Sequence, residues 1–250
     1  MKETSAANLV VVSDERALAQ ALAERVVELG RQAIAARSRF NIALAGGSTP
    51  KATYALLTEP PFRQALDWKR VRFFFGDERC VPPDDEQSNY RTAKLTLFDG
   101  LSIRREATFR MHGENEPEAA AGSYAAVILR ELPLDHLVPT LDLILLGMGP
   151  DGHTASLFPG TDPLEDDELL VRAPYVEKFS THRITLTPRV LNGARDVIVA
   201  TAGPAKADAL AAVLHGPRDP ATYPIQILEP RAGRLTWLVD RAAAAKLPPS

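Results

Sequence analysis

The 250-residue sequence predicts an α/β fold in which helices flank a mostly parallel β-sheet. Three observations support this prediction. Short β-branched or aromatic runs recur along the chain, segments with helical periodicity lie between several of them, and the composition, 45% hydrophobic and 24% charged, is typical of a globular protein. Strands that alternate with helices favour a parallel sheet, and ligands then bind at the carboxyl ends of its strands. No repeat or low-complexity linker divides the chain, so we expect residues 1–250 to form a single domain.

The expected strands are apolar runs bounded by turn-forming or charged residues, which is typical of buried strands. They are Leu9–Val12, Phe40–Ala45, Val71–Phe75, Leu141–Gly147, Arg183–Thr187, Asp196–Thr201 and Leu235–Val239.

The clearest helical pattern runs from Asp14 to Arg37, where apolar residues recur at spacings of four, four, three and four. These residues are Leu18, Leu22, Val26, Leu29 and Ala33. Ser13 is expected to cap this helix, and the acids at positions 14 and 15 suit the positive end of its dipole. Further helices are predicted at Pro50–Leu57, Glu116–Leu132, Ala205–Leu214 and Arg241–Lys246.

Charge and cysteine content exclude several classes of protein. The chain has 29 Lys and Arg against 32 Asp and Glu, a net charge of −3, so it has no overall positive field to bind a nucleic acid or an anionic membrane. Cys80 is the single cysteine and cannot form an intramolecular disulfide, which favours a reducing compartment. The polar N-terminus lacks the layout of a signal peptide, and no apolar run approaches the ~20 residues that span a bilayer. We therefore expect a cytoplasmic protein.

The first chemical motif, Gly46-Gly47-Ser48, follows an apolar strand and precedes a helical pattern. The two glycines allow a ligand to approach the backbone, and Thr49 and Pro50 suit the N-cap and first position of the helix. The free N–H groups of such a helix start favour an anion such as phosphate. The alternative is an ordinary strand-to-helix turn.

The second motif is a fully apolar strand that ends in three glycines around Asp151 and His153. His153 is the best candidate for a general base, because an imidazole titrates near neutral pH and accepts a proton from water. The alternative is that His153 caps a turn while Asp151 bonds only the backbone.

The third motif places Asp77, Glu78 and Arg79 directly after the strand Val71–Phe75 and Gly76. At the rim of the sheet, Arg79 could stabilise an oxyanion, and Asp77 could orient a partner or bind sugar hydroxyls. A solvated ion pair between Asp77 and Arg79 is the alternative.

Two separate cations are further candidates for ligand binding. Arg183 opens a strand, and Lys206 lies at the start of an expected helix, where a cation opposes the helix dipole. For Lys206 the alternative is an ordinary surface lysine. The remaining histidines lack the spacing of metal ligands, so we expect no metal site.

Read in order, six motifs resemble the 6-phosphogluconolactonases. They are Ala-Gly-Gly-Ser-Thr-Pro at 45–50, Gly-Asp-Glu-Arg at 76–79, Ser-Asn-Tyr-Arg at 88–91, Gly-Met-Gly-Pro-Asp-Gly-His-Thr-Ala-Ser-Leu-Phe-Pro at 147–159, Arg-Ile-Thr-Leu-Thr at 183–187 and Gly-Pro-Ala-Lys at 203–206. The segment Trp-Leu-Val-Asp at 237–240 also looks like that family. The resemblance is specific because the motifs occur in order over most of the chain.

The resemblance implies a Rossmann-like α/β fold related to glucosamine-6-phosphate deaminase and ribose-5-phosphate isomerase, and not a β-propeller. It also implies hydrolysis of 6-phospho-D-glucono-1,5-lactone to 6-phosphogluconate, in the oxidative pentose phosphate pathway, without a cofactor. The expected partner is the sugar-phosphate lactone alone, and the expected assembly is a monomer or a small homo-oligomer.

By similarity, His153 is the base that activates water, and Arg79 stabilises charge at the reacting carbon. Asp77 and Asp151 orient these groups or bind substrate hydroxyls. The phosphate is expected to bind at Gly46, Gly47, Ser48, Arg183 and Lys206.

Two alternatives share these motifs. A glucosamine-6-phosphate deaminase of the same family carries a glutamate for ring opening five residues after the histidine, where this chain has Phe158, which cannot transfer a proton. A non-catalytic sugar-phosphate sensor would need a DNA-binding module, and the residues before Phe40 are occupied by one strand and one long helix.

Overall fold

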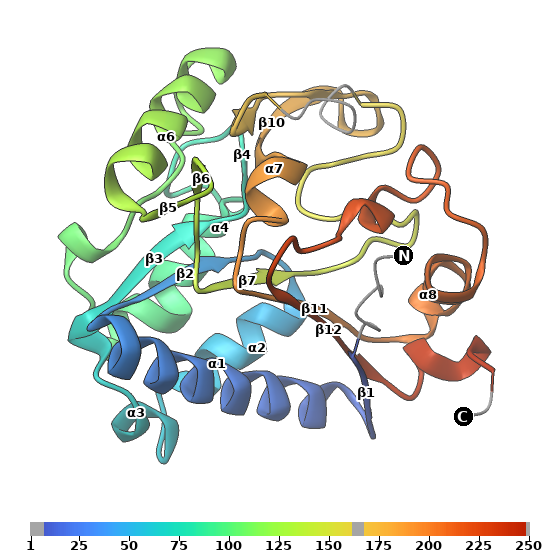
Figure 1. Cartoon of the computed structure of the whole chain (residues 1–250), viewed down its shortest axis with the longest axis horizontal. Coiled ribbons are helices and arrows are strands. Elements are labelled where there is room, and N and C mark those ends of the chain that lie inside the picture. The colour runs from blue at the N-terminus through green and yellow to red at the C-terminus, as the bar shows by residue number, and fades with distance from the viewer. Residues whose placement is uncertain (1–7, 162–167, 249–250) are drawn as a thin grey trace.

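A six-stranded parallel sheet forms the centre of the computed structural model, which describes residues 8–161 and 168–248. The strand order is β1-β12-β11-β7-β2-β3, and every neighbouring pair is parallel (Figure 1). The strands are β1 (Asn8–Val12), β2 (Phe40–Leu44), β3 (Val71–Phe75), β7 (Leu143–Leu146), β11 (Asp196–Thr201) and β12 (Arg234–Asp240). The predicted fold class is therefore confirmed. The acidic stretch Thr161–Glu168 is predicted from its sequence to be a surface loop, and residues 162–167 of it lie outside the described residues.

Helices cover both faces of this sheet. In Figure 1, α1 (Glu15–Arg37) and α2 (Ser48–Leu57) lie on one side, whereas α6 (Pro117–Glu131) and α7 (Pro188–Leu191) lie on the other. The remaining α-helices are α3 (Phe62–Ala65), α4 (Asn89–Ala93), α5 (Asp99–Leu101) and α8 (Ala207–His215). Shorter helical turns are η1 (Trp68–Arg70), the π-helical η2 (Lys94–Phe98), η3 (Arg105–Ala107), η5 (Glu177–Phe179), η6 (Pro204–Lys206), η7 (Pro224–Ile227) and η8 (Ala243–Lys246). Within the described ranges, no helix combines the length and apolar character needed to cross a membrane.

A smaller antiparallel sheet corrects the expected position of the Arg183–Thr187 strand. It consists of β4 (Asp77–Arg79), β10 (Thr181–Leu186) and β8 (Val171–Arg172), with β9 (Tyr175–Val176) also paired to β10. A separate hairpin joins β5 (Leu134–Asp135) to β6 (Val138–Pro139). The residues after Gly76, expected at the rim of the sheet, form the short strand β4. A short buried strand has the same apolar sequence pattern in a parallel and in an antiparallel sheet, so the pattern did not distinguish the two kinds of sheet.

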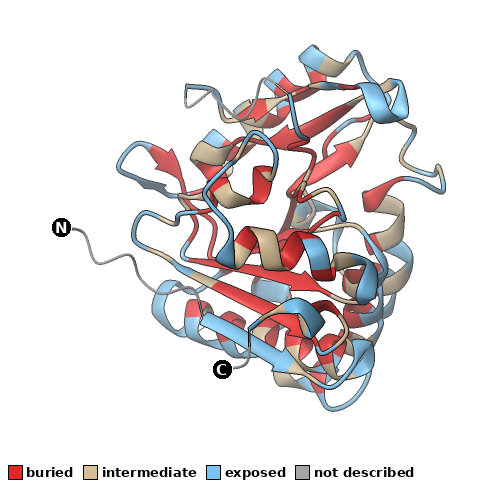
Figure 2. Cartoon of the chain, turned by 90° about the vertical axis from the view of Figure 1, so that its right-hand side faces the viewer, coloured by how far each residue is buried: buried red, intermediate tan, exposed pale blue. Residues whose placement is uncertain are grey.

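The core lies between the central sheet and its helices. All five residues of β2 and all four of β7 are buried, and Figure 2 shows buried strands running through the molecule. The ring of Phe74 stacks on Phe109 with centroids 4.7 Å apart, and Phe73 packs against Phe98 at 5.0 Å. The edge strand β1 differs, because its first four residues are exposed.

Three helix boundaries differ from those expected. Asp14, not Ser13, caps α1: its carboxylate accepts from the backbone N–H of Ala17 at 2.9 Å, and the Ser13 hydroxyl donates to that carboxylate. At α2 the N-cap is Gly47, so Ser48 is already helical. The expected helix over 241–246 is reduced to the 3₁₀ turn η8.

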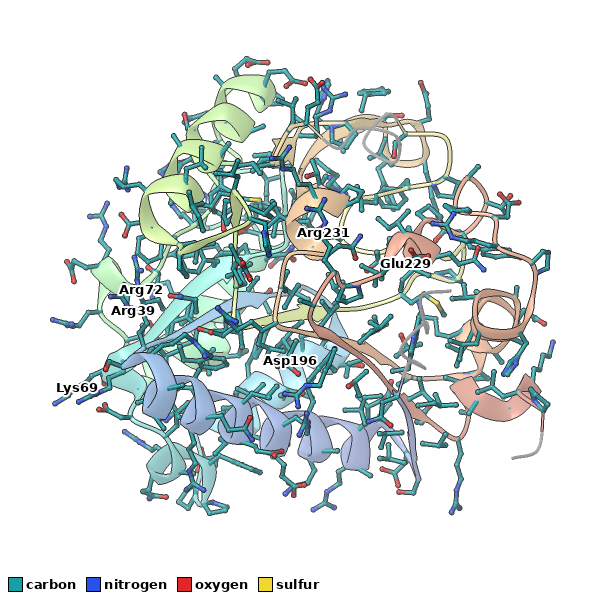
Figure 3. The ribbon with its side chains drawn as sticks, in the orientation of Figure 1. Arg39, Lys69, Arg72, Asp196, Glu229 and Arg231 are labelled. Atoms are coloured by element: carbon teal, nitrogen blue, oxygen red, sulfur yellow. The ribbon has the colours of Figure 1, made fainter. Side chains whose placement is uncertain are left out.

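Ion pairs gather at the amino ends of the strands. Asp142, which precedes β7, binds Arg37 at 2.8 Å, and Asp196 at the start of β11 binds Arg234 at 2.9 Å. Figure 3 marks Asp196 in this region, together with Arg39 before β2. These charges lie at the opposite end of the strands from the site described next.

Candidate active site

A pocket of about 260 Å³ opens at the carboxyl edge of the sheet, where β2, β3, β7 and β11 end. The structure brings most of the residues expected at the site into its lining: Gly46, Gly47, Ser48, Asp77, Arg79, His153 and Lys206. Asp151 and Arg183 lie outside this lining and contact it through His153 and Arg79, as shown below.

The glycine loop after β2 is fixed by side chains from two helices. The buried hydroxyl of Tyr54 on α2 accepts from the N–H of Ala45 at 3.0 Å and donates to its carbonyl at 2.8 Å. Gly46 is in such close contact with the amide of Asn89 that a Cβ would collide with it, and Gly47 has φ = 106°. Because Gly47 caps α2, the first N–H groups of that helix face the pocket, which favours an anion there.

His153 is held by a carboxylate two residues before it. Its Nδ1 forms a short hydrogen bond with Oδ1 of Asp151, which also accepts from the His153 backbone N–H. A carboxylate accepts, so we assign the proton to Nδ1, which leaves Nε2 of a neutral ring unprotonated. Burial raises the pKa of Asp151. The hydrogen bonds from Lys178 and His153 outweigh this effect and hold the pKa well below its ordinary value. Asp151 therefore orients the histidine and does more than bond the backbone.

An aromatic residue packs against the face of the His153 ring. The ring of Phe158 stacks on His153 with centroids 4.2 Å apart, and Phe179 packs edge-on against Phe158 at 5.7 Å. Phe158, the residue that the resemblance sets against the glutamate of the deaminases, thus has a packing role.

Asp77 occupies a different environment from Asp151. Its Oδ2 accepts from the hydroxyl of Ser156 at 2.7 Å, and its Oδ1 accepts from the amide of Asn89 at 3.1 Å. Across the described part of the chain, Asp77 forms no ion pair with Arg79, whose Nη1 donates to the carbonyl of Gln87 at 2.5 Å. The solvated ion pair considered from the sequence is therefore not formed.

Arg79 and Arg183 are opposite each other on antiparallel strands. They are register partners on β4 and β10, so their side chains share one face of this small sheet. Burial lowers the pKa of Arg183, and the neighbouring charge of Arg79 lowers it further. Two adjacent guanidinium groups without carboxylate partners among the described residues form a site suited to an anion.

Lys206 ends the turn η6 and lines the pocket. Its loop begins at Gly203, with φ = 90°, whose N–H donates to Oδ1 of Asp240 at 3.0 Å. Burial lowers the pKa of Lys206, and the charge of Asp151 opposes this effect. Lys206 is thus a half-buried cation that lines the pocket, not an ordinary surface lysine.

Two residues in or beside the pocket were given no role by the sequence. Glu78, fully buried, accepts from the backbone N–H groups of Asn89 and Tyr90 and anchors the start of α4, and burial raises its pKa. Thr201 at the end of β11 lines the pocket with a buried hydroxyl that has no hydrogen-bond partner among the described residues. The Ser-Asn-Tyr-Arg motif was a signal for α4, and Ser88 does cap that helix. The sequence signal for Thr201 was its position at the carboxyl end of the expected strand Asp196–Thr201.

The parallel sheet, with its ligand pocket at the carboxyl edge and a carboxylate-oriented histidine between cations, defines the class of Rossmann-like α/β enzymes that bind anionic substrates. Residues 13–237 match the family described as glucosamine-6-phosphate isomerases/6-phosphogluconolactonase. The chain belongs to this family, as its motifs predicted.

Individual relatives agree with this assignment. A protein named 6-phosphogluconolactonase from Treponema pallidum is 38% identical over 215 residues, which are 86% of this chain and 89% of the relative. The solved 6-phosphogluconolactonase of Trypanosoma brucei superposes with a TM-score of 0.85 at 30% identity, covering 97% of this chain and 99% of that one. A monomeric glucosamine-6-phosphate deaminase has a TM-score of 0.81 at 19% identity, covering 96% of this chain and 99% of the other, and this similarity shows the fold alone.

Proposed function

We propose that this protein is a 6-phosphogluconolactonase that hydrolyses 6-phospho-D-glucono-1,5-lactone to 6-phosphogluconate. The observation that carries the proposal is the Asp151–His153 pair, which leaves Nε2 of the histidine unprotonated in a pocket that also contains Arg79 and Lys206. The names of the relatives support the same substrate.

The proposed reaction needs one base and one positively charged group. Nε2 of His153 takes a proton from water while the water oxygen forms a bond with the lactone carbonyl carbon, and Arg79 stabilises the resulting oxyanion. The carbonyl re-forms as the bond to the ring oxygen breaks, and the imidazolium returns its proton to that oxygen as a hydroxyl. A lactone is an activated ester, so no covalent nucleophile, metal ion or cofactor is required.

The phosphate binds away from the reacting carbon in this proposal. Lys206, Arg183 and the start of α2 at Ser48, with the Gly46-Gly47 backbone, supply positive charge and N–H groups for it. Binding energy from the phosphate then fixes the carbonyl near His153. Asp77, whose oxygens are bonded to Ser156 and Asn89, positions the wall of the pocket.

The wider setting is part of the same proposal. The half-buried Cys80 as the single cysteine favours a reducing compartment, so we place this step in the cytoplasm and in the oxidative pentose phosphate pathway. The 1–250 chain acts as one domain, which its continuous hydrophobic core supports. No observation favours the deaminase, because Phe158 holds the place of the required acid.

The test is hydrolysis of freshly generated 6-phosphogluconolactone, coupled to oxidation of the product, with a blank for spontaneous opening. The wild-type rate should far exceed the blank, and His153→Ala should lower kcat by about 10²–10⁴-fold. The matched control is His136→Ala, since His136 is exposed on the β5–β6 turn. A wild-type rate equal to the blank, with saturable binding of 6-phosphogluconate, would instead favour the sensor.

A further inference from the structure

A lysine outside the pocket contacts the carboxylate that holds the base. Nζ of Lys178 lies 2.9 Å from Oδ2 of Asp151, while Oδ1 of the same carboxylate binds Nδ1 of His153. The carboxylate is therefore bonded at both oxygens, and it cannot rotate without losing one of these bonds. Lys178, Asp151 and His153 form a continuous chain that ends at the unprotonated nitrogen.

The turn that carries Lys178 is packed onto the same site. Lys178 is the middle residue of η5, which joins β9 to β10, and its neighbour Phe179 packs against Phe158, the ring that stacks on His153. The guanidinium of Arg183 lies over the ring of Phe179, 5.1 Å from its centroid. These contacts fix the backbone of η5, so the lysine reaches Asp151 from an ordered turn.

We propose that Lys178 is a positioning residue for the base: it holds the Asp151 carboxylate in the orientation that binds Nδ1 of His153, and its charge offsets the carboxylate so that the imidazole stays neutral. This inference rests on the lactonase mechanism proposed above, in which a neutral His153 accepts a proton from water. Without Lys178, the uncompensated negative charge of Asp151 favours the imidazolium, which cannot act as a base.

Other charges face the same imidazole from neighbouring elements. These groups are Asp77 and Arg79 on β4 and Lys206 on η6. Among the described residues, none of these three groups has a hydrogen bond or an ion pair with the His153 ring. Within the described residues, Lys178 is the cation that bonds Asp151 directly, so its removal changes the immediate partner of the histidine.

Three variants test the proposal. Lys178→Met removes the ammonium group and keeps an unbranched stem, and Lys178→Arg restores a cation. Lys94→Met is the matched control: Nζ of Lys94 also lies 2.9 Å from a carboxylate, that of Asp99, and its side chain is 49% exposed against 53% for Lys178. The kcat and KM for lactone hydrolysis are measured for each protein as a function of pH.

Lys178→Met should lower kcat about tenfold at neutral pH and change KM by less than about twofold. The acidic limb of its kcat/KM profile should move to higher pH by about 0.5–1 pH unit. Lys178→Arg should recover most of the activity, and Lys94→Met should match the wild type. The proposal is overturned if Lys178→Met raises KM alone or behaves as Lys94→Met does.

A second measurement separates this proposal from the proposed function. The ¹⁵N signals of the His153 ring report its tautomer and charge without any substrate. We expect protonated Nδ1 in the wild type and more imidazolium in Lys178→Met at the same pH. If the wild type fails to hydrolyse the lactone but Lys178→Met still contains more imidazolium than the wild type, the proposed function is wrong and the positioning role stands. If the wild type is active and the ring signals are the same in both proteins, the positioning role is wrong.

Discussion

Lys206, proposed above to bind the phosphate, lines the pocket. It is half-buried, burial lowers its pKa, and it has no ion-pair partner among the described residues, an arrangement that an anionic ligand would complete. Arg79 and Arg183 likewise have no ion-pair partner among the described residues. The residues of the pocket therefore carry positive charge that the folded chain itself does not neutralise.

We expect Lys206→Ala to raise KM for the lactone by about 10–100-fold and to change kcat much less, because a phosphate contact stabilises ground and transition states alike. Steady-state kinetics check this expectation. Lys246→Ala is the control, since Lys246 pairs with Asp208 outside the pocket. A fall in kcat at constant KM would contradict the binding role.

Gly149 is a residue whose lack of a side chain serves the site. A Cβ at this position would collide with Nδ1 of His153 and Oδ1 of Asp151. Gly149→Ala should therefore displace the pair and lower kcat by at least about tenfold, with little change in unfolding temperature.

The matched control for Gly149→Ala is Gly122→Ala. Gly122 lies within α6 and has nothing near the added Cβ, so this change should stabilise the fold by about 0.5–1 kcal/mol and leave kcat unaltered. Thermal unfolding and kinetics measured on both variants decide the matter. Equal kcat in the two variants would show that Gly149 is not required by the histidine pair.

At the scale of elements, the local sequence predicts where some helices begin and not where others do. The stripe of α1 and the cap of α4 at Ser88 follow from their own sequences. The start of α2 does not, because both Ser48 and Thr49 are sound N-caps in isolation, and the structure instead begins the helix at Ser48 with Gly47 as its cap. Gly47 is placed there by the path of the loop around the pocket.

The segment that leads into α6 contains an ion pair that makes stability depend on pH. Both oxygens of Glu114 accept from the guanidinium of Arg110, at 2.6 and 2.8 Å, which lowers the pKa of Glu114 from 4.5 to about 2. A carboxyl with a depressed pKa stabilises the fold above its ordinary pKa, and this contribution is lost as pH falls from about 4.5 towards 2.

Arg110→Met should therefore reduce the free energy of unfolding by about 1 kcal/mol at neutral pH and by about half of that or less near pH 3. Urea unfolding of the wild type and the variant at both pH values measures the difference. If the difference is the same at the two pH values, the ion pair does not cause the pH dependence.

At the scale of the whole molecule, the pocket is built by two sheets. The central sheet supplies the loops after β2, β7 and β11, and the antiparallel sheet supplies Asp77 and Arg79 and the strand that carries Arg183. A ligand that bridges the walls binds the folded chain and not the unfolded one, so it stabilises the fold as a unit.

We expect 6-phosphogluconate to raise Tm, with a stabilisation of about 2.7 kcal/mol when its concentration is about 100 times Kd. Lys206→Ala should need a much higher concentration of the ligand for the same rise in Tm, whereas Lys246→Ala should respond as the wild type does. Thermal unfolding against ligand concentration is the measurement. An equal response in the wild type and Lys206→Ala would remove Lys206 from the binding site.

The sequence by itself determined the fold class, the family and most of the residues at the pocket. It could do so because buried strands, helical stripes and glycine-rich turns are local patterns, and because the carboxyl ends of parallel strands meet at one edge. Only the tertiary structure decided the different hydrogen-bond partners of Asp77 and Asp151 and the place of Arg183 in a second sheet. It also brought Lys178 to Asp151. Some of these features are contacts between residues far apart in the chain, and others depend on which of several nearby side chains makes a contact. Both depend on packing that no local pattern specifies.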